Sequence, residues 1–305
     1  MNSQLGKIFF IASLFFSTQA LAATYNLPSN NEALIGKMQS AVVNSSDTTA
    51  TVAQNYDLGY NSIEDANAEF NPSRLPKGSE LKIPTYHLLP SLPRKGIIIN
   101  LSEMRMYYFP KGSNKVMTYP IGIGKIGKTI PIAETNVIKK KKDPIWIPPE
   151  DIRQFNMDQG VILPRIMPPG PDNPLGPYAI YLGLPTYLIH STIFPESVGR
   201  RASFGCIRMY KSDIESFFPT IEKGVPVVIT TNTVKIGWQD NKLYMESHYP
   251  LEEHGDETDT SLSGVVDLIN QTSSQKLPLI NWELVSYLAK VRDGIPHPIG
   301  FSAPN

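Results

Sequence analysis

The chain contains a single cysteine, Cys206, in the segment Ser203-Phe204-Gly205-Cys206-Ile207-Arg208, sixteen positions after His190. A thiolate attacks carbonyl carbons, but it needs a base or a nearby positive charge to form near neutral pH. An imidazole, with a free pKa of about 6.5, can accept the thiol proton and later protonate a leaving amine. Of the five histidines, His190 is the closest in sequence to Cys206. The pair therefore predicts a cysteine nucleophile with a histidine base.

The neighbouring residues predict how a reacting carbonyl would be held. Gly205 lets a substrate approach the backbone, so the amides of Gly205 and Cys206 are candidate oxyanion donors. Arg208 offers a fork suited to a substrate carboxylate, or it forms a structural ion pair. No acidic residue lies beside His190, so we expect a backbone carbonyl to hold its imidazole. Further candidates to orient the imidazole or line the pocket are Ser191, Thr192 and Ser203.

A lone cysteine also has two other interpretations, a buried inert thiol and an intermolecular disulfide. Structural cysteines of exported proteins usually occur in pairs, which favours the nucleophile here. The sequence has no cluster of histidine, cysteine and carboxylate residues at ligand spacing, so we expect no metal and no other cofactor.

The N-terminus has the three parts of a secretory signal. Lys7 is followed by an apolar run over residues 8–16 and by Ala20-Leu21-Ala22, a small-x-small end. The run is too short to span a bilayer, which takes about 20 residues. We expect a signal peptide over residues 1–22, a mature chain beginning near Ala23 and a periplasmic location. The polar residues 24–32 are expected to be loose.

The composition favours a mainly β body and excludes a strongly charged partner. Basic and acidic residues number 28 each, so no nucleic-acid partner is expected. With 27 prolines, 21 glycines and 18% charged residues, the chain is rich in loops. The proline-rich stretch 143–177 is expected to form a long loop, as a wall or lid over a site. A capping box over residues 212–215 predicts a helix. Strands are expected at 96–100, 105–109, 115–120, 134–140, 178–182, 187–190 and 225–230.

Smaller units flank this body. Residues 34–84 combine two short helices with flanking strands and resemble a LysM module, which binds N-acetylglucosamine in cell-wall glycan. A structural spacer is the alternative. Residues 84–93 are expected to be a linker, and residues 232–305 a small α+β extension with one hairpin and two helices.

Several motifs resemble one enzyme family. His190-Ser191-Thr192, followed by residues 199–208, resembles the signature of the L,D-transpeptidases (YkuD domain). Residues 119–124, 143–149 and 169–176 resemble the periplasmic subgroup, which carries a LysM-like module. The resemblance implies a β-sandwich catalytic domain over residues 95–231. It also implies that Cys206 is the nucleophile and His190 the base, with Ser191, Gly205 and Arg208 in the pocket.

The family resemblance also implies a substrate. The thiol attacks a tetrapeptide stem of peptidoglycan at the L-centre of diaminopimelate, D-alanine leaves, and an amine acceptor takes the acyl group. The acceptor is a second diaminopimelate or the terminal lysine of an outer-membrane lipoprotein. Peptidoglycan stem peptides and glycan are thus the expected partners, and carbapenems the expected covalent inhibitors.

The chain departs from the family pattern at two places, and two other functions are alternatives to transpeptidation. Phe204 stands where many members have histidine, and Ile130-Pro131-Ile132-Ala133 replaces a Thr-Pro-x-Gly turn. The same bond could instead be hydrolysed by an L,D-carboxypeptidase or an amidase. A non-catalytic peptidoglycan-binding protein would use the LysM-like module alone.

Overall fold

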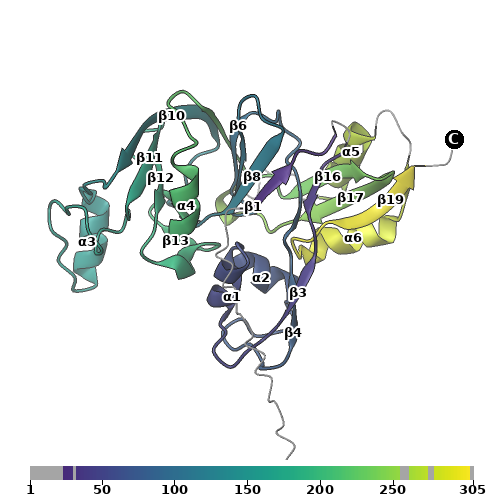
Figure 1. Cartoon of the computed structure of the whole chain (residues 1–305). Helices are drawn as coiled ribbons and strands as arrows, with labels where there is room; N and C mark the ends of the chain where they lie inside the picture. The colour runs from purple at the N-terminus through teal and green to yellow at the C-terminus, as the bar shows by residue number, and fades with distance from the viewer. Residues whose placement is uncertain (1–22, 30–31, 255–260, 274–277, 303–305) are drawn as a thin grey trace, which may run out of the picture.

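The computed structural model describes residues 23–29, 32–254, 261–273 and 278–302. The expected signal peptide lies outside these residues. Figure 1 shows a large β-rich body at the left and centre, a small unit with two helices below it, and a C-terminal unit at the right. Strands outnumber helices in the described chain, so the mainly β architecture expected from the sequence is confirmed.

The large body is built on one nine-stranded sheet. Its strand order is β1-β8-β7-β6-β15-β10-β11-β12-β14, in which only the β6/β15 and β12/β14 pairs are parallel. The strands are β1 (Ala23–Asn26), β6 (Gly96–Asn100), β7 (Arg105–Phe109), β8 (Lys115–Pro120), β10 (Ala133–Lys142), β11 (Tyr178–Leu182), β12 (Leu188–Ser191), β14 (Ile207–Met209) and β15 (Pro226–Thr230).

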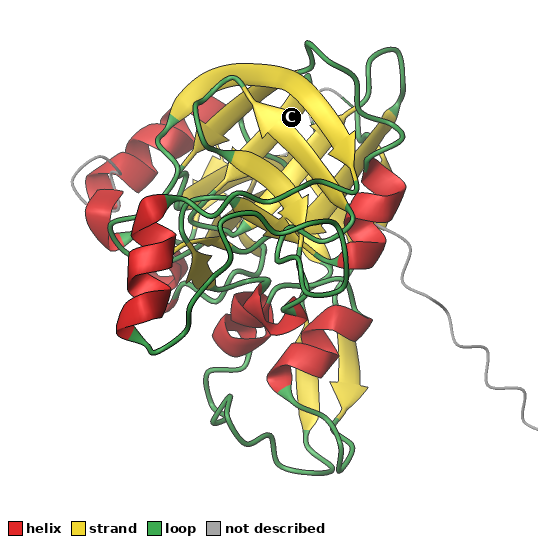
Figure 2. Cartoon of the chain, turned by 90° about the vertical axis from the view of Figure 1, so that its left-hand side faces the viewer, coloured by secondary structure: helices red, strands yellow, loops and turns green. Residues whose placement is uncertain are grey.

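The long strand β10 turns this sheet into two layers. Its first half pairs with β15 and its second half with β11, with a bulge between Val137 and Lys139. A bulge bends a strand and increases its twist, and the strands curve over one another in Figure 2. Ile97 and Ile229 from one layer meet Ile189 and Ile207 from the other in a single core. The expected sandwich is therefore one continuous sheet folded back at β10.

The small unit has the order strand, helix, helix, strand. It consists of β3 (Gln39–Val42), α1 (Thr49–Asn55), α2 (Tyr60–Ala66) and β4 (Glu80–Ile83). Its two strands are antiparallel, and Val52, Leu58 and Leu81 are part of its core. Asn67 joins α2 to β4, because its side chain donates to the Lys82 carbonyl (2.9 Å) and accepts from the Lys82 amide (2.8 Å). We refer to residues 34–84 as the LysM-like unit.

The C-terminal unit is a four-stranded sheet with two helices. The sheet order is β16-β17-β19-β18, and Val265 of α5 and Leu288 of α6 pack in its core. The elements are β16 (Val234–Gln239), β17 (Lys242–Ser247), α5 (Leu262–Thr272), β18 (Pro278–Ile280), α6 (Trp282–Val291) and β19 (His297–Ser302).

A buried ionic cluster joins these units. The Lys235 ammonium in β16 lies 2.9 Å from Glu103 Oε1 and 2.8 Å from Glu246 Oε1, and it donates to the Leu88 carbonyl at 2.7 Å. Burial acts to raise the pKa of Glu103, but the surrounding cations hold it below its usual value. Ligand atoms of His87, Glu103 and Glu246 lie close enough to hold a metal ion. The lysine ammonium already supplies positive charge to both carboxylates there.

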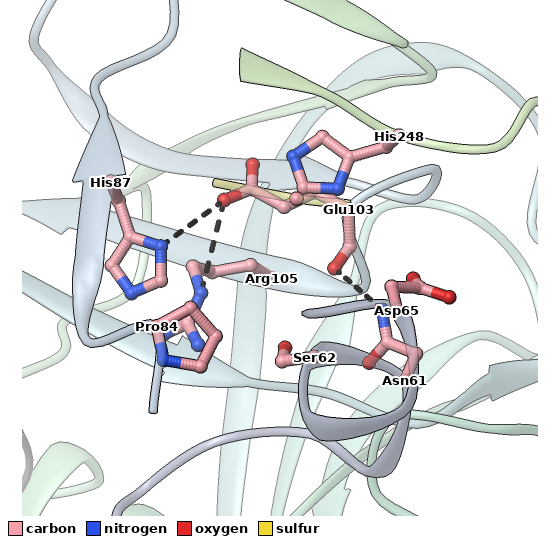
Figure 3. Close-up of a pocket in the computed structure, with 9 residues that line it drawn as sticks. Asn61, Ser62, Asp65, Pro84, His87, Glu103, Arg105 and His248 are labelled. Carbon is pink, nitrogen blue, oxygen red and sulfur yellow. Dashed lines mark hydrogen bonds and ion pairs between the residues drawn. The ribbon is translucent and has the colours of Figure 1, made fainter. Parts of the chain in front are cut away.

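Figure 3 shows the side of this junction that faces α2. His87 and Arg105 approach the Glu103 carboxylate at 4.0 and 3.8 Å, and the Asn61 amide donates to the Glu103 carbonyl at 3.3 Å. His87 lies in β5 (Tyr86–Leu88), inside the stretch expected to be a linker. Strand β5 pairs with β2 (Leu34–Gly36). The expectation of a plain linker was therefore wrong.

Two other local expectations also differ from the structure. Residues 24–32 were expected to be loose, but Tyr25 and its neighbours in β1 pair with β8 and extend the main sheet. The expected capping box does not form, since helix α4 (Lys211–Phe217) begins one residue before Ser212. Its N-cap is Tyr210, whose hydroxyl donates to the Leu58 carbonyl (2.9 Å) of the LysM-like unit. Tertiary contacts therefore determine the conformation of residues 23–26 and the start of α4.

The LysM-like unit also supports the loop between His190 and Cys206. The amides of Tyr60 and Asn61, at the start of α2, donate to the carbonyls of Val198 (3.0 Å) and Gly199 (3.2 Å). These bonds satisfy helix N-terminal amides that have no side-chain cap. The Arg200 guanidinium stacks on the Tyr60 ring at 3.5 Å. None of the described helices is long and apolar enough to cross a membrane.

Gly199→Ala should destabilise the protein by roughly 2–4 kcal/mol, from strain, steric overlap and weakened hydrogen bonds. Gly199 has φ +76°, and an added Cβ would lie 2.1 Å from the Tyr60 amide nitrogen. Gly112→Ala is the matched control, because Gly112 has φ +73° and open space around its Cβ. Urea unfolding of both variants measures the difference. Equal losses would show that the close approach to α2 contributes nothing.

Candidate active site

The parallel pairing of β12 with β14 positions the segments that carry the two predicted catalytic residues. His190 is opposite Arg208, and Ile189 is opposite Ile207. Ile189 and Ile207 point into the core, so side chains one position along each strand point to the other face. His190 and Arg208 therefore share the face away from the core, and Cys206 directly precedes β14.

The His190 imidazole is held in one tautomer by its own strand. Nδ1 forms a hydrogen bond with the Ser191 carbonyl oxygen. A backbone carbonyl is the group expected from the sequence to hold the imidazole in this way. A carbonyl only accepts, so Nδ1 carries the proton and Nε2 keeps its lone pair. Burial, reinforced by the Arg208 charge, lowers the pKa of His190 to about 3. The imidazole is therefore a neutral base at physiological pH.

The Cys206 thiol is half-buried and protonated at rest. Its Sγ donates to the Thr186 carbonyl at 3.6 Å. Burial raises the pKa of Cys206, while the backbone of Leu188 and the charge of Arg208 oppose this rise. The thiol and the imidazole are thus both neutral at rest. The proton must move to the base as the sulfur attacks.

Ser203 shapes the turn that presents the thiol. Its hydroxyl donates to the Cys206 carbonyl at 2.6 Å and accepts from the Gly205 amide at 3.1 Å. Gly205 has φ +113°, and a Cβ there would lie 2.7 Å from the Tyr187 ring, so only glycine fits without rearrangement. The Gly205 amide is occupied by Ser203 in this structure, which leaves the Cys206 amide as the candidate oxyanion donor.

Arg208 has the features of an anion-binding residue. Its backbone is fixed by two hydrogen bonds with Gly122, each 2.9 Å long. Its guanidinium lies 5.9 Å from the Phe194 ring, and Nε is buried without a hydrogen-bond partner. Among the described residues it forms no ion pair with a carboxylate. The fork is therefore available to an incoming carboxylate.

Ser191 and Thr192 follow His190 directly, and both side chains are buried. The Ser191 hydroxyl is buried without a hydrogen-bond partner, and a Cβ on Gly176 would lie 2.6 Å from Ser191 Cβ. The contribution of Ser191 to the base is its carbonyl. Thr192 Oγ1 accepts from the Phe194 amide at 3.0 Å and forms the turn after β12.

The proline-rich segment contains a helix that packs beside the nucleophile. Helix α3 (Glu150–Asp158) lies within the stretch expected to be loop. Phe155 and Phe204 pack edge to face with centroids 5.2 Å apart, and the Lys125 ammonium lies 3.7 Å from each ring. Phe204, the departure from the family pattern, thus attaches this helix to the nucleophile turn.

Two further contacts fix the same segment. Lys128 pairs with Asp151 at 2.7 Å. The buried Asn173 donates to the carbonyls of Pro144 (2.9 Å) and Pro168 (3.1 Å) and accepts from the Leu175 amide (3.0 Å). Sequence reasoning did not assign Asn173, Lys125 or Tyr187 to the site. The unusual Phe204 was the one local signal that could have led to Phe155 and Lys125.

Comparison with known proteins gives a consistent result. The family model for the L,D-transpeptidase catalytic domain (YkuD) matches residues 94–229. The probable L,D-transpeptidase YcfS of Escherichia coli K12 is 35% identical over 293 residues, or 94% of this chain and 91% of the relative. The probable L,D-transpeptidase YbiS of the same strain is 37% identical over 258 residues, or 82% and 84%. The NMR structure of the Enterococcus faecium L,D-transpeptidase catalytic domain covers 46% of this chain and 99% of that chain, at 24% identity and TM-score 0.35.

YcfS is similar to this chain over nearly the whole length of both proteins. The catalytic-domain match falls on the folded sheet that carries His190 and Cys206. The chain therefore belongs to the L,D-transpeptidase family.

Proposed function

We propose that this protein is a peptidoglycan L,D-transpeptidase of the periplasm in which Cys206 carries the acyl group. Family membership supports the reaction class. The assignment of residues rests on one observation: the Ser191 carbonyl accepts from Nδ1 of His190, which leaves the lone pair on Nε2, in the strand that pairs with the one directly after Cys206. The periplasmic location rests on the N-terminal sequence pattern.

In the acylation step, Cys206 Sγ attacks the carbonyl at the L-centre of diaminopimelate in a tetrapeptide stem. His190 Nε2 takes the thiol proton, and the Cys206 amide donates to the developing oxyanion. As the tetrahedral intermediate collapses, the imidazolium returns the proton to the amine of D-alanine. The C–N bond breaks, D-alanine leaves, and a thioester remains on Cys206.

In the transfer step, an amine attacks the thioester. The acceptor is the side-chain amine of a second stem or the terminal lysine of an outer-membrane lipoprotein. His190 takes a proton from the acceptor and returns it to the sulfur, so the thiol is regenerated as the new amide forms. Arg208 is suited to hold the carboxylate of the departing D-alanine, because its Nε is buried without a hydrogen-bond partner among the described residues.

We infer that the LysM-like unit contacts the glycan strands of the same polymer. A pocket opens between the end of β3 and helix α1. The pocket is lined by polar residues, among them Asn44, Asp47, Asn55 and Tyr56, and by apolar residues such as Val42 and Leu81. Mixed polar and apolar lining suits a sugar ring. A glycan held there would be bound to the unit that supports the loop between the two catalytic residues.

Carbapenem acylation tests the assignment of the nucleophile. The intact protein should gain the mass of one carbapenem molecule, and Cys206→Ala should gain none. His190→Asn should slow adduct formation by about 10²–10⁴-fold, the usual contribution of a general base. Ser191→Ala is the control that should still react, since its carbonyl is retained. Mass spectrometry gives the result, and an adduct on Cys206→Ala would refute the assignment.

The pH dependence of thiol reactivity tests the neutral resting state. Because burial raises the pKa of Cys206, less thiolate is present near pH 7 than in an ordinary cysteine. Alkylation by iodoacetamide should rise about tenfold per pH unit between pH 6 and 8, without a plateau. The peptide of residues 203–208 is the reference. A plateau below pH 7 would indicate a thiolate–imidazolium pair instead.

Product analysis determines the acceptor. Purified tetrapeptide muropeptides should give a dimer, or a conjugate when a peptide ending in lysine is added. Either product requires an amine to reach the thioester. Release of D-alanine alone would establish the hydrolytic alternative, an L,D-carboxypeptidase. Retention of muropeptides without any product would favour a binding protein. Liquid chromatography with mass spectrometry separates these outcomes.

A further inference from the structure

A pair of buried carboxyl groups lies where three segments of the chain meet. Asp57 follows α1 in the LysM-like unit, and Asp213 lies in the first turn of α4. Their exposed fractions are 7% and 1%. Asp57 Oδ1 and Asp213 Oδ2 are both buried without any other hydrogen-bond donor in the described part of the chain, and the two carboxyl groups bond to each other. Adjacent buried carboxyl groups are costly unless a proton or a cation lies between them.

Arg105 supplies positive charge to this pair, and its Nη2 is buried without a hydrogen-bond partner in the described part of the chain. Burial raises the pKa of both groups, and the Asp57 charge raises that of Asp213 further. Arg105 opposes the rise, but its Nε is 3.8 Å from Glu103 and its Nη1 donates to Thr118. The other titratable groups that act on the pair's surroundings are the neutral phenols of Tyr25, Tyr119 and Tyr210.

The third segment is the beginning of β1. Ala23 pairs with Thr118 in β8, and its nitrogen donates to Asp57 Oδ2 at 3.1 Å. Ala23 is also the residue that follows Ala20-Leu21-Ala22, the expected cleavage motif. In the precursor this nitrogen is a neutral amide with one proton. Hydrolysis of the bond between Ala22 and Ala23 by a leader peptidase consumes one water and leaves a carboxylate on Ala22 and an ammonium on Ala23.

We propose that leader removal adds a cation to this site beside Arg105, and that the α-ammonium of Ala23 forms a buried ion pair with the carboxyl pair through Asp57. The ion pair fastens β1, the LysM-like unit and α4 to one another. Asp57 is two positions before Gly59 in the chain. The backbone of Gly59 adjoins Gly199 in the loop between the catalytic residues. The proposal goes beyond the enzymatic reaction and rests on cleavage before Ala23.

The first experiment measures the reactivity of the α-amine in the exported, processed protein. Intact mass should show that the chain begins at Ala23. Limited acetylation at pH 7 should modify this amine at least about tenfold more slowly than the amine of the peptide Ala-Thr-Tyr-Asn, because a buried ion pair raises the pKa by a unit or more. Asp57→Asn and Asp213→Asn should each speed the reaction. Glu64→Gln, on the exposed side of α2, should not change it.

The second experiment adds one glycine before Ala23, which restores a neutral amide at the site and moves the amine away. The extended protein should unfold at a lower urea concentration than the processed protein, and this difference should vanish in the Asp57→Asn background. An amine that reacts at the peptide's rate, or equal unfolding midpoints, would overturn the ion pair. A mature chain that begins elsewhere would also overturn it. Carbapenem acylation of Cys206 tests the enzyme separately in each case.

Discussion

The pairing of β12 with β14 is the constraint on which the active site depends. Parallel strands keep a fixed offset, and a slip by one residue would turn every side chain to the opposite face. The correct register places His190 and Arg208 opposite each other and leaves Ile189 and Ile207 in the core. Packing of the core therefore fixes the geometry of the chemistry. The loop between these strands is in turn supported by α2 of the LysM-like unit.

Burial determines the charge state of the resting site. Taking an imidazole and a thiol out of water disfavours the charged form of each, so the pKa of His190 falls and that of Cys206 rises. The positive charge of Arg208 acts in the same direction on the imidazole and in the opposite direction on the thiol. A site of this kind keeps the thiol protonated until a carbonyl is in place. In the proposed reaction, charge would then develop where Arg208 and the Cys206 amide could stabilise it.

The sequence was sufficient to predict most strands of the main sheet and to select His190 and Cys206 as the candidate catalytic pair. A lone cysteine after a histidine is a local signal, and strands such as β6 and β15 are continuous apolar runs. Helix α3 was missed because the surrounding prolines were interpreted as loop, although Pro148-Pro149 is compatible with a helix start. Strand β5 was missed because its partner, β2, is about 50 positions earlier. Lys235 acts through partners such as Glu103 that are distant in sequence, and Asn173 acts through backbone carbonyl groups. No local sequence pattern therefore indicates the role of either residue.

The Lys235 cluster has a consequence for protein engineering. Its ammonium comes from the C-terminal unit, Glu103 from the catalytic body, and Leu88 from the strand that leaves the LysM-like unit. A transplant of residues 95–231 into another scaffold would carry Glu103 and Arg105 without the lysine that neutralises the carboxylate. The catalytic body is consequently not expected to be stable when it is transferred without the C-terminal unit. Chimeras between relatives should exchange Lys235, Glu246 and Glu103 together, or exchange none of them.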